Sequence, residues 1–276
     1  TKERDVRYTK AETSNSHTLQ IDYTEPFDSS KHVVEAGIKY ILRYNASDNQ
    51  YRRYNPITGE YDQYDLDDKG NIRKENDMDY YQHIVGAYAS YTFKLKKFSL
   101  RLGGRLEGTY QDVRFADEVA RNFKVRFLDL IPYVSTSFKL TDASNLRVSY
   151  NNGISRPSIW FLNPYVDNTD PYLISYGNPN LKSERSHNFS VSYGLFSQKL
   201  NLSISAYSSI VNNSIESNDS VDSKGIRYHT YANIGSNGNL GGSFYINYNP
   251  IKWFSFWTSL STGYSRYTNR ASISEG

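Results

Sequence analysis

The chain has 276 residues, a net charge of +3 and no cysteine. The near-balanced charge gives no footprint for nucleic acid, and the lack of thiols excludes disulfides, thiol catalysis and cysteine-based zinc sites. No stretch approaches 18 apolar residues, which excludes a membrane-spanning helix, and the mean hydropathy is −0.69. Aromatic residues make up 15% of the chain, including 26 tyrosines, and such residues favour strands and boundaries between apolar and wet surroundings.

Residues 1–15 are polar and aperiodic, and we predict the end of a loop there. Further along, apolar and polar residues alternate with a period of two, which is typical of strands with one apolar face. Tight turns near positions 28, 96, 142, 198 and 250 join the alternating segments in pairs. The ten predicted strands cover residues 19–24, 34–44, 81–93, 98–110, 130–138, 146–150, 189–195, 200–206, 240–248 and 254–264.

Long connections separate the hairpins, and the three largest are predicted at 45–79, 152–187 and 211–239, with a moderate one near 116–121. Turn chemistry inside the first and third predicts small hairpins at Asn55–Gly59, Asp67–Asn71 and Asp222–Gly225.

Short turns on one side and long loops on the other are typical of an outer-membrane barrel, whose alternating strands keep the mean hydropathy low. We therefore predict an all-β fold, an antiparallel transmembrane β-barrel segment of about ten strands with periplasmic turns and extracellular loops. We expect residues 1–276 to form one partial domain. The alternative is a soluble antiparallel sheet with one wet face. Five charged residues are predicted to face the lumen: Arg43, Arg101, Arg105, Glu107 and Arg147.

The stretch Ile154–Glu184 interrupts the strand pattern, because its four prolines forbid a continuous ladder. A loop of this length in a folded domain is usually functional or disordered, and its aromatic content favours an ordered loop. We predict that Trp160, Tyr165 and Tyr172 contact a ligand. The alternative is that these rings only pack the loop upon itself.

Two sequence phrases carry a family resemblance. Arg156-Pro157 precedes Leu162-Asn163-Pro164, and the run Gly177-Asn178-Pro179-Asn180-Leu181-Lys182-Ser183-Glu184 enters a strand. This resembles TonB-dependent outer-membrane receptors, in which a similar phrase ends an extracellular loop; Ser183 stands where that family usually has proline. Asn233-Ile234-Gly235 also resembles the family pattern. The resemblance is strongest over residues 146–267.

The resemblance implies TonB-dependent uptake across the bacterial outer membrane by a barrel that holds a plug domain. It implies four partners: outer-membrane lipid, the plug of the same full-length chain, the TonB system reached through the N-terminal part of that chain, and an extracellular ligand. No nucleic acid partner is expected. The chain shows no plug and no TonB box, so we expect a slice of the barrel that forms an open, curved sheet and transports nothing alone. The alternative is a small adhesion or binding barrel with no transport role.

Two kinds of site chemistry are weak in this sequence. Asp65–Gly70 begins like a calcium loop, but Lys69 and Asn76 stand at ligand positions. An omptin-like barrel protease would need an acid pair, such as Asp77 and Asp79, and an Asp–His couple, for which no Asp-x-His occurs. We therefore predict no catalytic residue, metal or cofactor.

Overall fold

A computed structural model describes residues 6–63, 77–116, 122–164, 166–170 and 172–269. The chain divides into two compact units. The first unit comprises residues 1–19, 39–85 and 108–126, and the second comprises 20–38, 86–107 and 127–276. In the described ranges, no helix is long and apolar enough to cross a membrane.

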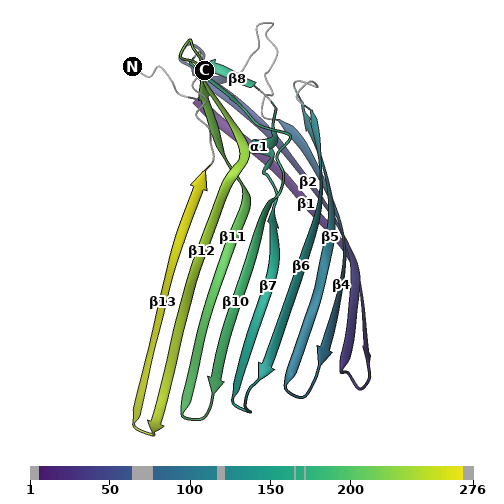
Figure 1. Ribbon diagram of the computed structural model, residues 1–276. Helices are drawn as coiled ribbons and strands as arrows, with labels where there is room; N and C mark the ends of the chain where they lie inside the picture. The colour runs from purple at the N-terminus through teal and green to yellow at the C-terminus, as the bar shows by residue number, and fades with distance from the viewer. Residues whose placement is uncertain (1–5, 64–76, 117–121, 165, 171, 270–276) are drawn as a thin grey trace. The chain divides into compact units, whose positions relative to one another are not determined.

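Ten long strands and three short ones form a single sheet in the described residues (Figure 1). The long strands are β1 (Val6–Phe27), β2 (His32–Asn55), β4 (Met78–Lys94), β5 (Phe98–Phe115), β6 (Phe123–Lys139), β7 (Ser144–Ser155), β10 (Glu184–Phe196), β11 (Leu200–Val221), β12 (Arg227–Ile251) and β13 (Phe254–Asn269). The short strands are β3 (Glu60–Gln63), β8 (Val166–Asp170) and β9 (Leu173–Tyr176), and one helix, α1, covers Ile159–Leu162.

The strand order is β1-β2-β4-β5-β6-β7-β10-β11-β12, and β13 pairs with β12. Antiparallel pairing prevails, with a parallel contact between β9 and the start of β12. Within the described ranges no pairing joins β1 to β13, so the sheet is not closed. The predicted all-β, antiparallel, ten-strand architecture is confirmed.

The five tight turns lie where the sequence predicts them, between β1 and β2, β4 and β5, β6 and β7, β10 and β11, and β12 and β13. The predicted hairpin turns at Asn55–Gly59 and Asp222–Gly225 also form. In the second of these, the Asp222 carboxylate accepts hydrogen bonds from the backbone N–H groups of Lys224 and Ile226, and Gly225 adopts a φ of 81°. The predicted turn at 67–71 lies outside the described residues.

The long strands extend well beyond their predicted ends. Residues 6–15 belong to β1 instead of a loop, and most of the predicted loop 211–239 is a continuous β11–β12 hairpin. Likewise β2 continues to Asn55 in the predicted loop 45–79. These extensions lack apolar alternation, but cross-strand backbone pairing satisfies their N–H and C=O groups without an apolar face.

In the second unit, the sheet has an apolar face and a hydroxyl-rich face. One cross-strand row of the apolar face comprises Phe138, Leu146, Tyr193, Ile204, Phe244 and Leu260. One cross-strand row of the other face comprises Ser137, Arg147, Ser192, Ser205, Ser243 and Ser261. Large apolar side chains are exposed to a degree that monomeric soluble proteins rarely show; Leu260, for example, is 66% exposed. The exposed apolar face fits contact with lipid.

Among the described residues, buried apolar side chains are few. In the first unit they are Tyr80, Ile84, Val113, Phe115, Phe123 and Val125. In the second unit they are Leu162 and Leu181, and both lie in the segment between β7 and β10. That segment therefore has a small core of its own, which is unusual for a connection between two strands.

Candidate functional site: the aromatic loop and its anchors

The predicted long loop between β7 and β10 is the most elaborate connection among the described residues. We call residues 156–183 the aromatic loop; it contains α1, β8 and β9 and lies wholly in the second unit. It begins four residues later and ends four residues earlier than the predicted 152–187, because β7 continues to Ser155 and β10 begins at Glu184. It is an ordered loop over its described residues, as predicted.

A buried charge network fixes both ends of the aromatic loop to β5 and β6. At the entry, the Arg156 guanidinium donates to Glu107 Oε2 at 2.6 Å and lies 3.3 Å from Asp129 Oδ2. At the exit, the Ser183 hydroxyl donates to the same Asp129 Oδ2 at 3.1 Å. Arg105 adds an ion pair to Glu107 at 3.0 Å. The side chains of Arg156, Glu107 and Asp129 are 16%, 12% and 5% exposed, so solvent screens these charges far less than it would at a surface.

Gly177 and Asn178 close the aromatic loop upon itself. The Gly177 N–H donates to Asn163 O at 2.8 Å, and the Asn178 N–H donates to Phe161 O. A Cβ added at Gly177 would lie 2.5 Å from Asn163 O and 2.8 Å from Phe161 O, so only glycine allows this close approach. Asn178 Oδ1 also accepts the Asn180 N–H at 3.0 Å, which shapes the turn into Leu181. The start of the Gly177–Glu184 run therefore makes the hydrogen bonds that close the aromatic loop.

The β11–β12 hairpin supports the aromatic loop from a second direction. Asn178 Nδ2 donates to Tyr231 O at 2.9 Å, and the Phe161 ring packs on the Tyr231 ring with centroids 4.4 Å apart. Asn233 accepts the Lys182 N–H at 2.8 Å and donates to the Lys182 carbonyl at 2.9 Å. The parallel pairing of β9 with β12 extends this contact. Asn233, noted in the sequence only for its resemblance, thus clamps the exit of the loop.

The aromatic side chains of the loop divide into packed and exposed groups. Leu162 is fully buried and Phe161 contacts Tyr231, whereas Trp160 is 61% and Tyr172 is 71% exposed. The third predicted ligand residue, Tyr165, lies outside the described residues. Adjacent residues therefore differ in role: Phe161 and Leu162 pack inside the structure and stabilise the loop, whereas the Trp160 side chain is exposed to solvent.

A second polar cluster, missed by the sequence analysis, lies at the tip of the β11–β12 hairpin. Asp219 accepts from Arg227 at 2.6 Å and contacts His229 Nδ1 at 2.6 Å, and His229 Nε2 lies 3.2 Å from the Tyr231 hydroxyl. Hydrogen bonds from Arg227, and then from His229, lower the pKa of Asp219. The Asp222 carboxyl, in the turn itself, also has a lowered pKa, chiefly because of the Ile226 N–H. The signal was available, since Asp219 lies three residues before the predicted turn and His229 lies four residues after it.

The residues that the sequence analysis considered for an enzyme or a cation site belong to different parts of the chain. Asp77 and Asp79 lie in the first unit, where the Tyr44 hydroxyl donates to Asp79 Oδ1 at 2.7 Å. In the second unit, both ring nitrogens of His229 are engaged within the hairpin tip. The calcium-like run Asp65–Gly70 lies outside the described residues. Among those that are described, no three metal-ligating side chains cluster together.

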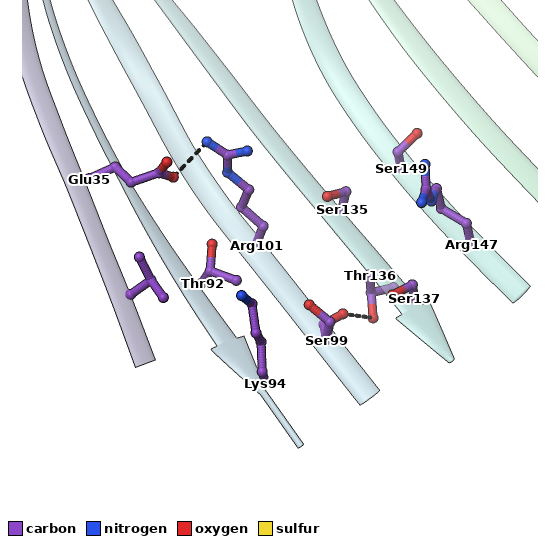
Figure 2. A pocket seen from close by; sticks show the side chains of 11 residues that line it. Glu35, Thr92, Lys94, Ser99, Arg101, Ser135, Thr136, Ser137, Arg147 and Ser149 are labelled. Atoms are coloured by element: carbon purple, nitrogen blue, oxygen red, sulfur yellow. Dashed lines mark hydrogen bonds and ion pairs between the residues drawn. The ribbon is translucent and has the colours of Figure 1, made fainter. Parts of the chain in front are cut away.

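Four of the five residues predicted to face the lumen lie on strands of the second unit. Arg101, Arg105 and Glu107 alternate along β5 and so share one face, and Arg101 lines the same cavity as Arg147 of β7 (Figure 2). Arg43, in the first unit, donates to Gln82 at 3.1 Å. The face of the second unit that carries the four charges is also its hydroxyl-rich face.

Comparison with known proteins identifies the fold. The model of the family described as "Outer membrane protein beta-barrel family" matches residues 1–276. The comparison with curated proteins gave no match. Among solved structures, the copper transporter OprC matches with a TM-score of 0.67 and 16% identity over 93% of this chain and 38% of that chain. The ferric citrate transporter FecA, in its unliganded form, matches with a TM-score of 0.67 and 12% identity over 96% of this chain and 37% of that chain.

A third solved structure is the pyoverdine outer membrane receptor FpvA from Pseudomonas aeruginosa PAO1 bound to pyoverdine. It matches with a TM-score of 0.63 and 17% identity over 95% of this chain and 37% of that chain. The chain thus spans somewhat over a third of each of these proteins. Identities this low relate the folds alone, and the fold is that of TonB-dependent receptor barrels, as the Gly177–Glu184 phrase predicts. The chain belongs to the outer membrane protein β-barrel family, and its location is the bacterial outer membrane.

Proposed function

We propose that the chain is part of the barrel wall of an outer-membrane receptor that takes up a ligand with energy from the TonB system. In this proposal the hydroxyl-rich face, with Arg101, Arg105, Glu107 and Arg147, lines the lumen and faces a plug domain of the same protein. The role is non-enzymatic: the wall and its loops bind and admit a ligand.

The observation that carries the proposal is the construction of the aromatic loop. Two carboxylates, the largely buried Glu107 and the buried Asp129, hold its ends, and Gly177 closes it, while Trp160 and Tyr172 remain exposed. A fixed loop that displays aromatic rings suits recognition, because little conformational entropy is lost when a ligand binds. A loop that merely connected two strands would need neither the charge network nor the exposed rings.

The ligand class stays open among siderophores, glycans, peptides and vitamins, so the test begins with a panel. Host cells that depend on this protein are supplied with ferric citrate, ferric pyoverdine, cyanocobalamin, a maltooligosaccharide and a hexapeptide, each as sole source of its nutrient. Growth on at least one compound, lost when tonB is deleted, is expected. Growth that survives the tonB deletion on every compound would contradict TonB-dependent uptake and favour a passive or adhesive barrel.

Trp160→Ala then tests the aromatic loop with the compound that supports growth. Truncation of one aromatic anchor in a binding site typically costs about 1–3 kcal/mol, so affinity should fall roughly 5-fold to 150-fold. Trp253→Ala is the matched control, because Trp253 is 84% exposed in a tight turn of the same unit. Equal affinity of Trp160→Ala and wild type would remove Trp160 from the ligand site.

A further inference from the structure

A concave polar site lies on the hydroxyl-rich face near the tight turns, away from the aromatic loop. A cavity of about 510 Å³ is lined from β2, β4, β5, β6 and β7, all within the second unit (Figure 2). Its cations are Lys94, Arg101 and Arg147, and its one acid is Glu35. The function proposed above places this face on the lumen wall but assigns no ligand to the cavity.

The positive charge of this site is only partly compensated. Arg101 pairs with Glu35 at 2.7 Å, and Glu35 also accepts from the Ser90 hydroxyl at 2.8 Å. Neither the Lys94 amine nor the Arg147 guanidinium has a hydrogen bond or ion pair to a described residue. Two positive charges therefore lack a partner among the described residues, and they lie in a cavity, where field lines are concentrated.

An adjoining cavity of about 540 Å³ increases this positive charge. It shares Lys94, Ser99 and Ser137 with the first cavity. It adds three lysines and one aspartate to the lining: Lys96, Lys97, Lys139 and Asp142. Asp142 pairs with Lys139 at 3.1 Å, so the two cavities together hold six cations and two acids, a net charge of +4 by subtraction.

Hydroxyl groups surround the unpaired arginine. Ser137 of β6 and Ser192 of β10 lie directly opposite Arg147 on its two neighbouring strands. Ser135, one pleat further along β6, lines the same cavity. A guanidinium with serine hydroxyls beside it offers the set of N–H and O–H donors that carboxylate and phosphate oxygens accept.

The spacing of the two unpaired cations indicates the size of the ligand. Lys94 on β4 and Arg147 on β7 are three strands apart, roughly 14 Å at about 4.8 Å per strand. This is the separation of the two backbones, and a ligand with several acidic groups can span it with one group at each cation. We propose that this face is a binding site for a polyanion, with Arg147 and Lys94 each holding one carboxylate or phosphate group.

Two kinds of molecule carry several carboxylate or phosphate groups: a free small polyanion and an acidic stretch of polypeptide. Intact protein extracted from the outer membrane is titrated calorimetrically with tripolyphosphate and, separately, with hexa-aspartate at low ionic strength. Loss of one charge-assisted contact should weaken binding about tenfold in Arg147→Gln, and by a similar factor in Lys94→Gln. Arg266→Gln, an exposed arginine on β13, is the matched control and should bind like wild type.

Each outcome decides the proposal. Binding of either probe that weakens in Arg147→Gln and Lys94→Gln but not in Arg266→Gln supports the site. Tripolyphosphate alone identifies a free polyanion, and hexa-aspartate alone identifies an acidic polypeptide. No binding of either probe, or equal weakening in all three variants, overturns the proposal. Both test residues are exposed, so the variants should fold, which circular dichroism checks. The outcome is independent of growth on the uptake panel.

Discussion

Arg156 is the residue whose removal should most clearly separate the aromatic loop from the wall. Replacing it with Gln deletes the only cation within 3.3 Å of both Glu107 and Asp129 in the described structure. Removing one partner of a buried ion pair costs about 3–5 kcal/mol. Arg105 still pairs with Glu107 at 3.0 Å, and Ser183 still donates to Asp129. These remaining contacts reduce the expected loss to roughly 2–3 kcal/mol.

The assay is hydrogen–deuterium exchange of the intact protein in detergent micelles, read on peptides from residues 156–183. If the loop opens as a unit, 2–3 kcal/mol accelerates exchange of its protected amides about 30-fold to 150-fold. The amides of β10 and β11 near their tight turn should be unaffected. Arg156→Lys keeps the charge but loses the planar fork, so an intermediate acceleration is expected.

Arg185→Gln is the matched control, because Arg185 lies 3.8 Å from Asp129 and is 38% exposed. A pair that is this exposed contributes at most about 1 kcal/mol. The reasoning fails if loop exchange in Arg156→Gln changes by less than threefold, or if Arg185→Gln has the larger effect. Either result would mean that the ion pairs of Arg156 do not hold the loop.

Three further changes test separate parts of the structure. Gly177→Ala forces a Cβ against backbone atoms of the loop and should destabilise it by roughly 1–3 kcal/mol, seen as faster exchange confined to residues 156–183. Val191→Lys places a charge on the exposed apolar face and should lower stability in lipid by about 2–4 kcal/mol, whereas Ser205→Lys on the opposite face, between Ser192 and Ser243, should be tolerated; equal urea midpoints for the two would refute the face assignment. Asp219 has a lowered pKa in the folded state, so its contribution is present above its unfolded pKa and is lost as pH falls through the folded one. Amide exchange at the hairpin tip should accelerate, relative to pH-matched controls, below about pH 4, and Asp219→Asn should abolish that dependence.

The sequence predicts the strands best where lipid imposes the pattern. Near the tight turns, one face of each strand must be apolar, so residues such as Val191 and Leu260 mark the strands by alternation. Farther from the tight turns, both faces of the strands are polar. Residues 211–221 and 227–239 therefore resemble a loop in sequence, although they pair as two strands. The ladder there depends on the partner strand, which a local pattern does not reveal.

The site was predictable in part. The prolines and aromatic residues of 154–184 mark an ordered loop, and the phrase at Gly177–Glu184 marks its end. The partners of Arg156 are 49 and 27 residues away in the sequence, by subtraction of Glu107 and Asp129, and no local spacing relates them. The sequence also does not show which aromatic ring is exposed. Trp160 and Phe161 are adjacent, and the short helix α1 points their side chains in different directions.

The single departure from the family phrase has a physical explanation in this chain. Asp129 is 5% exposed on its side chain, and a carboxylate that buried needs several donors. Arg156 supplies one, and Ser183 supplies another at 3.1 Å, from the position where the resemblance leads one to expect proline. A proline there has neither a hydroxyl nor an N–H to offer. Ser183 thus lacks the rigidity of proline but donates a hydrogen bond to Asp129. This bond joins the end of the aromatic loop to the same carboxylate that contacts Arg156 at its beginning.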